Sequence, residues 1–192
     1  MRSAEFDRQY VLRSAMTMFV EKGYGKTSMQ DLKRATGLHP GSIYCAFENK
    51  RGLLIAALEQ YQLDQTDWFH QVFDKHETVF EGLKDYMEHV LEECEREEIQ
   101  DCLLQKAMNE LSRQDDEVES MISDMLNNWH HMLTEKIQLM LDKNEIAPNR
   151  DARQLAEFLV MGIYGMRTMS HTNPEPGVLR NLSNQLIAYV AG

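Results

Sequence analysis

Cations, hydroxyl groups and small side chains gather in the first fifty residues, a mixture whose chemistry suits nucleic-acid phosphates. Residues 1–50 hold eight Lys and Arg against five Asp and Glu, a balance of +3, whereas the rest of the chain balances at −14. Phosphates attract a cationic segment, and a serine hydroxyl can bond to a base edge or a phosphate. The charge asymmetry therefore favours a DNA-binding head on an acidic body, with chance clustering as the alternative.

Other site chemistries find less support. Adjacent histidines such as His130 and His131 diverge by about 100° on a helix, so they do not readily chelate one ion. The three cysteines are too few and wrongly spaced for a disulfide framework or a CxxC zinc site. No GxSxG, P-loop, HExxH or GxGxxG motif occurs in a usable context. We predict no metal, no cofactor and no enzymatic activity. The alternatives are an enzyme and a helical adaptor whose head binds protein. Retention of the protein on DNA at low salt would distinguish a DNA-binding regulator from both.

Two cysteines are candidates for a redox sensor. Cys102 follows Asp101 at the expected start of a helix, where amide dipoles favour a thiolate. Cys94 lies eight residues earlier, near enough for a resolving disulfide to be conceivable. The acidic residues between Glu92 and Glu98 oppose a thiolate, so the charges favour the alternative of buried, unreactive cysteines.

The chain carries no signal for a membrane or for export. Its longest apolar run, Phe158–Tyr164, is far short of the roughly 20 residues that a membrane span needs. The first residues, Met1–Glu5, lack the apolar segment of a secretory signal. We predict a cytoplasmic protein without a membrane partner.

Helices must position all of these residues, because apolar residues recur at spacings of three and four and strand-like alternation is missing. The sequence predicts an all-α fold. Gly23 ends the first helix, Thr27 or Ser28 caps the second with Asp31 at capping-box distance from Ser28, and Pro40 can open the third. The expected helices are Phe6–Lys22, Ser28–Thr36, Pro40–Phe47, Leu53–Phe73, Val79–Glu97, Asp101–Arg113, Glu117–Lys143, Ala152–His171 and Pro176–Ala191.

Two short helices joined by a glycine-containing turn, with another helix in front, are the layout of a helix-turn-helix, whose second short helix enters the major groove. In the third helix, Ile43 and Phe47 are four residues apart and can pack inward. The residues left on its other side are Gly41, Ser42, Tyr44 and Cys45. We predict a three-helix DNA-binding domain at residues 1–52 and a C-terminal helical bundle for sensing and dimerisation at residues 53–192.

A longer pattern runs through the same segments without gaps. It consists of Val11-Leu12-Arg13-Ser14-Ala15-Met16-Thr17-Met18-Phe19, Gly23-Tyr24, Thr27-Ser28-Met29-Gln30-Asp31-Leu32, Ala35-Thr36-Gly37-Leu38, Gly41-Ser42-Ile43-Tyr44, Phe47, Lys50 and Leu53-Leu54. With it, residues 6–58 resemble the TetR/AcrR family of bacterial repressors. The resemblance implies a homodimer with one DNA-reading head per subunit, a palindromic operator, and a helical body whose ligand spreads the heads and releases the DNA.

The resemblance also implies roles for single residues of the head. Thr27 or Ser28 would contact a phosphate at a helix N-terminus, with Lys26 beside them. Tyr44 and Lys50 would clamp the DNA backbone. The positions for base reading or close approach are Pro40, Gly41, Ser42 and Cys45. His39 stands where a serine-type cap is common, and since imidazole is a poorer cap, it is expected to contact DNA instead.

Aromatic and methionine side chains in the C-terminal part suit a roomy pocket for a small apolar or aromatic effector. Core packing is the alternative reading of the same residues. The candidate lining residues are Trp68, Phe69, Phe73, Tyr86, Met108, Met125 and Trp129.

The segment Ala152–Ser170 is apolar on almost all sides and must be covered. Together with the apolar stripe of Pro176–Ala191 it is the predicted dimer interface, with burial inside one subunit as the alternative. The expected interface residues are Phe158, Gly162, Gly165, Met166, Leu179, Leu182 and Leu186.

Overall fold

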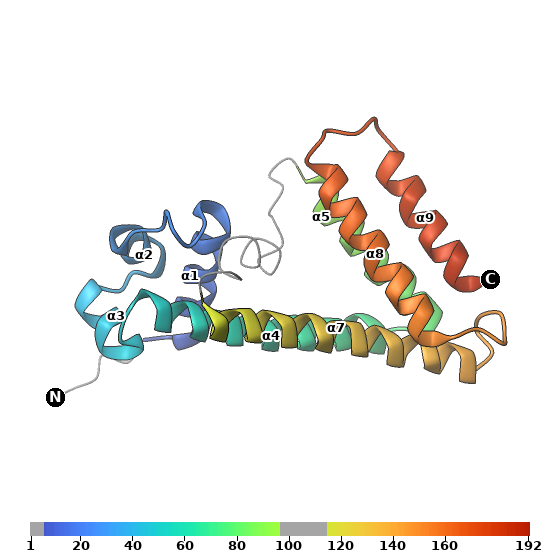
Figure 1. Cartoon of the computed structure of the whole chain (residues 1–192), viewed down its shortest axis with the longest axis horizontal. Helices are drawn as coiled ribbons and strands as arrows, with labels where there is room; N and C mark the ends of the chain where they lie inside the picture. The colour runs from blue at the N-terminus through green and yellow to red at the C-terminus, as the bar shows by residue number, and fades with distance from the viewer. Residues whose placement is uncertain (1–5, 97–114) are drawn as a thin grey trace. The chain divides into compact units, whose positions relative to one another are not determined.

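The structure, a computed structural model, describes residues 6–96 and 115–192, and within these ranges it is helical with no strand. The helices are α1 (Arg8–Lys22), α2 (Met29–Thr36), α3 (Pro40–Phe47), α4 (Lys50–Asp74), α5 (Val79–Glu95), α7 (Asp116–Asp142), α8 (Ala152–Ser170) and α9 (Val178–Ala191), shown in Figure 1. The all-α prediction is confirmed, and the helix limits agree within two residues except at the start of α4. The expected helix Asp101–Arg113 lies outside the described residues.

Local signals in the sequence set the limits of the first three helices. Ser28 and Asp31 form the capping box of α2, in which each side chain accepts a hydrogen bond from the other residue's backbone N–H. Gly23 and Gly37 follow α1 and α2 with φ of 80° and 71°, values that favour glycine. Pro40 occupies the first turn of α3, where its missing N–H costs nothing.

A tight turn joins α3 to α4 and makes α4 begin three residues earlier than predicted. The side-chain Oδ1 of Asn49 accepts a hydrogen bond of 2.9 Å from the N–H of Gly52. Asn49, the residue just before α4, is therefore the N-cap of that helix. Gly52 is required there because a Cβ atom would lie 2.1 Å from the carbonyl oxygen of Phe47. That contact is with backbone, which cannot rotate away.

The variant Gly52→Ala is therefore expected to lower the free energy of unfolding by roughly 1–3 kcal/mol, the usual cost of forcing extra volume into a packed site. Gly41→Ala is the matched control, because no described atom lies within 4 Å of the added Cβ. Alanine in that helix should be neutral or stabilising by roughly 0.5–1 kcal/mol. Urea denaturation measures both, and equal stability of the two variants would contradict the steric argument.

The chain forms two compact units. The first contains α1, α2, α3, α4 as far as Gln65, and the start of α7 as far as Met125; the second contains the remainder of α4 and α7 together with α5, α8 and α9. The boundary predicted after residue 52 falls inside α4. In the first unit, Phe19, Leu32 and Ile43 lie in the core.

In the second unit, α8 and α9 are neighbours and each packs on α5 (Figure 1). The fully buried side chains of this core include Leu83, Met87, Leu133, Ile137, Met140, Leu159 and Ile163. No helix among the described residues is both long and apolar enough to cross a bilayer.

Candidate DNA-binding interface

The outward face of α3 carries short side chains. Ile43 and Phe47 are buried on its inner face, as their spacing predicted, whereas Tyr44 is 51% exposed. The neighbouring residues that reach the surface are Pro40, Gly41, Ser42 and Cys45. Because these side chains are small, the backbone of α3 can approach another surface closely, and the hydroxyls of Ser42 and Tyr44 supply hydrogen-bonding groups there. His39 is the exposed residue before α3 and its side chain makes no capping hydrogen bond.

The structure separates the two hydroxyls that were alternatives for a phosphate contact. Thr27 is buried, and its Oγ1 donates a hydrogen bond of 2.7 Å to the carbonyl of Gly23. Ser28 is exposed at the N-terminus of α2, with its Oγ 2.7 Å from the carboxylate of Asp31. Of the two, only Ser28 presents its side chain to solvent. The Thr27 hydroxyl instead stabilises the α1–α2 turn through its bond to Gly23.

Several cations of the head are already paired within it. The buried carboxylate of Asp31 receives the Lys22 ammonium and the Arg34 guanidinium, each at 2.6 Å. The hydrogen bonds from Lys22 and from Ser28 hold the pKa of Asp31 well below its usual range. Lys26 and Lys33 are exposed and form no salt bridge with the described residues.

Lys50 points into the head rather than away from it. Its ammonium donates hydrogen bonds to the carbonyls of Tyr24 at 2.7 Å and of Thr27 at 2.9 Å, and lies 4.3 Å from the centre of the Tyr24 ring. Burial lowers the pKa of this ammonium. These partners differ from the DNA backbone expected from the family resemblance.

The next residue, Arg51, connects the first turn of α4 to the start of α7. Its guanidinium forms a two-pronged pair with Asp115 at 2.5 and 2.8 Å and reaches Glu117 at 2.6 Å. The same Asp115 accepts a hydrogen bond from the N–H of Val118. The guanidinium lowers the pKa of the Asp115 carboxyl to about 2. Sequence periodicity gave no signal for this pair, because its members lie more than sixty residues apart.

The aromatic residues expected to line a pocket come together in the second unit. Phe69, Phe73 and Tyr86 are buried with ring centres 4.8 to 6.1 Å apart. Half-buried Trp129 donates a hydrogen bond of 2.9 Å from its indole N–H to the Tyr86 hydroxyl.

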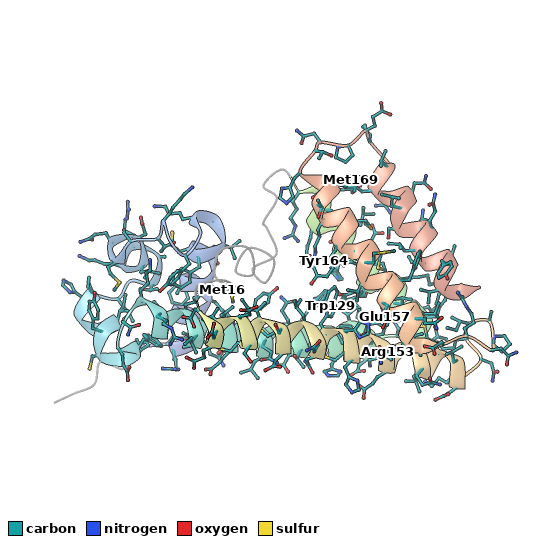
Figure 2. The ribbon with its side chains drawn as sticks, in the orientation of Figure 1. Met16, Trp129, Arg153, Glu157, Tyr164 and Met169 are labelled. Atoms are coloured by element: carbon teal, nitrogen blue, oxygen red, sulfur yellow. The ribbon has the colours of Figure 1, made fainter. Side chains whose placement is uncertain are left out.

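The edges of this aromatic cluster reach other helices. The ring of Trp68 packs at 5.6 Å from that of Tyr86. Figure 2 labels Trp129 of α7 and Tyr164 of α8, whose rings meet edge to face at 5.8 Å. Met125 is buried and belongs to the first compact unit, and Met108 lies outside the described residues. A cleft of about 320 Å³ at the Phe73 edge of the cluster is lined mainly by polar and charged residues, including Lys136 and Glu77, and so does not suit an apolar molecule.

The residues expected at a dimer interface divide into two groups. Met166, Leu179 and Leu186 are buried within the chain, and a Cβ on Gly162 would lie 2.3 Å from a methyl carbon of Leu186. These residues are buried because α8 and α9 each direct one apolar face toward α5 and toward one another. Gly165 is exposed, while Phe158 and Leu182 are half-buried.

Further apolar residues, missed from the sequence, extend this exposed group. Met161 and Tyr189 are 61% and 52% exposed, Met169 is also exposed at the end of α8 (Figure 2), and the Tyr189 ring lies 4.1 Å from that of Phe158. The signal was available, since positions 158, 161, 165 and 169 repeat at spacings of three and four. We call the set Phe158, Met161, Gly165, Met169, Leu182 and Tyr189 the outer α8–α9 face.

The cysteines have different environments. Cys94 lies in the core, and burial raises the pKa of its thiol to about 11, which keeps it protonated at neutral pH. Cys45 is exposed on α3, and Cys102 lies outside the described residues. Among the residues that the structure describes, no group of three or more His, Cys, Asp and Glu is arranged to hold a metal ion.

Comparison with known proteins agrees with this arrangement. The family model described as bacterial regulatory proteins, tetR family, matches residues 11–57, and that of the tetracyclin repressor-like C-terminal domain matches residues 79–186. The transcriptional repressor ComR of Escherichia coli is 32% identical over 173 residues, which cover 86% of this chain and 80% of ComR. The regulator YezE of Bacillus subtilis is 40% identical over 60 residues, 31% of each chain.

Solved structures share the fold. The cysteine mutant of the TetR family regulator CifR, complexed with a 26-base-pair operator DNA, superimposes with a TM-score of 0.82 at 22% identity and covers 98% of each chain. The two family models together span the head and most of the body, and ComR matches along most of both chains. This chain therefore belongs to the TetR family of bacterial regulatory proteins and is a DNA-binding transcriptional regulator, not an enzyme.

Proposed function

We propose that this regulator is a repressor that binds a palindromic operator as a homodimer and leaves it when a small effector binds. The observation that carries the proposal is the outward face of α3, where small side chains surround Ser42 and Tyr44 on a helix held from behind by buried Ile43 and Phe47. Such a helix suits entry into the major groove. ComR is named a repressor, and CifR is complexed with operator DNA.

The contacts divide by side-chain chemistry. Ser42 and Cys45 read base edges, and Pro40 and Gly41 allow the close approach that this reading needs. The groups assigned to the DNA backbone are Lys26, Ser28, His39 and Tyr44, all of which reach the surface. A regulator of this kind acts in the cytoplasm, where bacterial DNA lies.

The outer α8–α9 face is the dimer interface in this proposal. It is a continuous apolar repeat on two neighbouring helices of one unit, and exposed apolar patches of this kind mark protein interfaces. A two-fold axis through it would place the same residues of both subunits in contact. Two related heads then require a palindrome.

The effector is assigned to the body, at residues 53–192, and to the aromatic cluster around Tyr86. Half-buried Trp68 and Trp129 present aromatic surface there, and the indole–phenol hydrogen bond places polar atoms among the rings. This combination of aromatic faces with few polar groups fits a small apolar or aromatic molecule. Phe69 and Phe73 serve as the packed floor, because both are buried.

Selection of bound duplexes from random DNA tests the proposal. The wild-type protein should enrich a palindrome, and Ser42→Ala should change the base preference at one position of each half-site. Apolar and aromatic compounds added to the selected complex should release the DNA in proportion to their binding. Absence of any enriched sequence would refute operator recognition by α3.

A further inference from the structure

Lys50 stands at the junction of three elements of the head. It is the first residue of α4, two residues after the turn residue Glu48, and its ammonium reaches back to the turn between α1 and α2. There it donates to two carbonyls, those of Tyr24 and Thr27, separated by only three positions in the chain. A single side chain thus ties the first residue of α4 to the turn that leads into α2.

The surroundings of the ammonium are occupied by protein groups. Two of its three N–H groups have carbonyl partners at 2.7 and 2.9 Å, and the Tyr24 ring faces the charge at 4.3 Å. The Tyr24 ring in turn packs against Phe19 of the head core at 5.7 Å. To meet a phosphate, the ammonium would have to give up both charge-assisted hydrogen bonds and its place against the Tyr24 ring, and this loss offsets the gain from the new ion pair.

The segment that Lys50 holds contains residues assigned to DNA. The α1–α2 turn carries Lys26 and ends at Ser28, the N-cap of α2. Inside the same turn, the Thr27 hydroxyl bonds to the Gly23 carbonyl, and Lys50 holds the carbonyls of Tyr24 and Thr27, which flank the middle of the turn. A shift of this turn would move Ser28 relative to α3.

We propose that Lys50 is a positioning residue for DNA binding, which fixes the α1–α2 turn to the first turn of α4 and thereby sets α2 against α3 without meeting a phosphate. The inference rests on the proposed use of α3 and Ser28 at the operator. It assigns the phosphate contacts of this region to Lys26, whose side chain is exposed in the same turn.

The test compares Lys50→Met, Lys50→Arg and Lys26→Met on two duplexes, the one selected by the wild-type protein and a scrambled one. Lys50→Met should weaken binding to the selected duplex by about tenfold or more, because it removes both charge-assisted hydrogen bonds that hold the turn. Its slope of log affinity against log salt should stay unchanged, and the ratio between the two duplexes should fall. Lys50→Arg, which keeps a charged donor, should restore most of the affinity.

Lys26→Met is the matched control, because it removes a lysine from the same turn that has no salt bridge with the described residues. It should weaken both duplexes alike and reduce the salt slope by about 0.9 per head. Two results for Lys50→Met would overturn the inference. One is a reduction of its salt slope equal to that of Lys26→Met, with an unchanged ratio of affinities for the two duplexes. The other is an affinity and a ratio equal to those of the wild-type protein.

A second measurement needs no variant and so does not depend on folding of Lys50→Met. In the wild-type protein, the side-chain ammonium resonance of Lys50 should exchange slowly and keep its chemical shift when either duplex is added, while that of Lys26 should move. A shift of the Lys50 resonance equal to that of Lys26 would overturn the inference. Failure of the proposed function would be seen in a different experiment, the selection from random DNA, in which the wild-type protein would then enrich no sequence.

Discussion

Operator affinity should fall by about 10³-fold or more when the salt concentration rises from 50 to 200 mM, if each of two heads neutralises three or more phosphates. The physical cause is the release of counterions from DNA, which contributes less to binding as the salt concentration rises. In the described part of the head, the exposed basic side chains without salt bridges to the described residues are those of Arg8, Lys26 and Lys33, which makes three per subunit. The acidic body should add repulsion rather than further contacts.

Variants separate the cations that meet DNA from those that hold the head together. Lys33→Ala should reduce the salt slope by about 0.9 per head if Lys33 meets a phosphate. Lys22→Ala should leave the slope nearly unchanged, because the Lys22 ammonium is 2.6 Å from the Asp31 carboxylate. Titration of a labelled duplex at several salt concentrations gives both slopes, and a steep loss of slope in Lys22→Ala alone would contradict this division.

Charge counting found the DNA-binding head but not its working cations. Eight basic residues against five acidic ones predicted the right segment, yet Lys22 and Arg34 neutralise Asp31. Similarly, Arg13 forms a two-pronged pair with Asp64 of α4. A count of charges treats every cation as available, whereas the fold decides which ones have partners.

Short-range signals predicted the head well because its helix limits depend on neighbouring residues. The Ser28–Asp31 capping box and Pro40 at the start of α3 act within three or four positions. The start of α4 was missed because the cap of Asn49 lies inside a polar run that also looks like a loop. The burial of Thr27 was missed although its partner Gly23 lies only four positions earlier, because a threonine just before a helix suits an exposed N-cap equally well.

In the body, periodicity could say that α8 needs covering on most sides but not which partner covers each side. The structure answers this for one side: Gly162 and Met166 face the chain's own core. The exposed apolar residues of α8 include Met161 and Gly165, each one position before the core-facing Gly162 and Met166. Because successive residues on a helix differ by 100°, an error of one position exchanges the inner face for the outer one.

This distinction leads to the second expected result, that Met161→Glu converts the dimer to monomers. In the proposed interface it would place a carboxylate of each subunit in an apolar contact, at a cost of roughly 4 kcal/mol or more in total, which raises the dimer dissociation constant by about 10³-fold. Since Met161 is 61% exposed within its own subunit, the monomer should stay folded. Gly162→Glu would instead strike Leu186 and unfold the chain that carries it.

Light scattering with circular dichroism measures assembly and folding together. Leu139→Glu is the matched control, because Leu139 is an exposed apolar residue of α7 outside the outer α8–α9 face, and that variant should remain dimeric. A monomeric Met161→Glu protein should bind the full palindrome no more tightly than one half-site, since the gain from linking two heads is lost. A folded Met161→Glu dimer with full operator affinity would place the interface elsewhere and remove the outer α8–α9 face from the proposal.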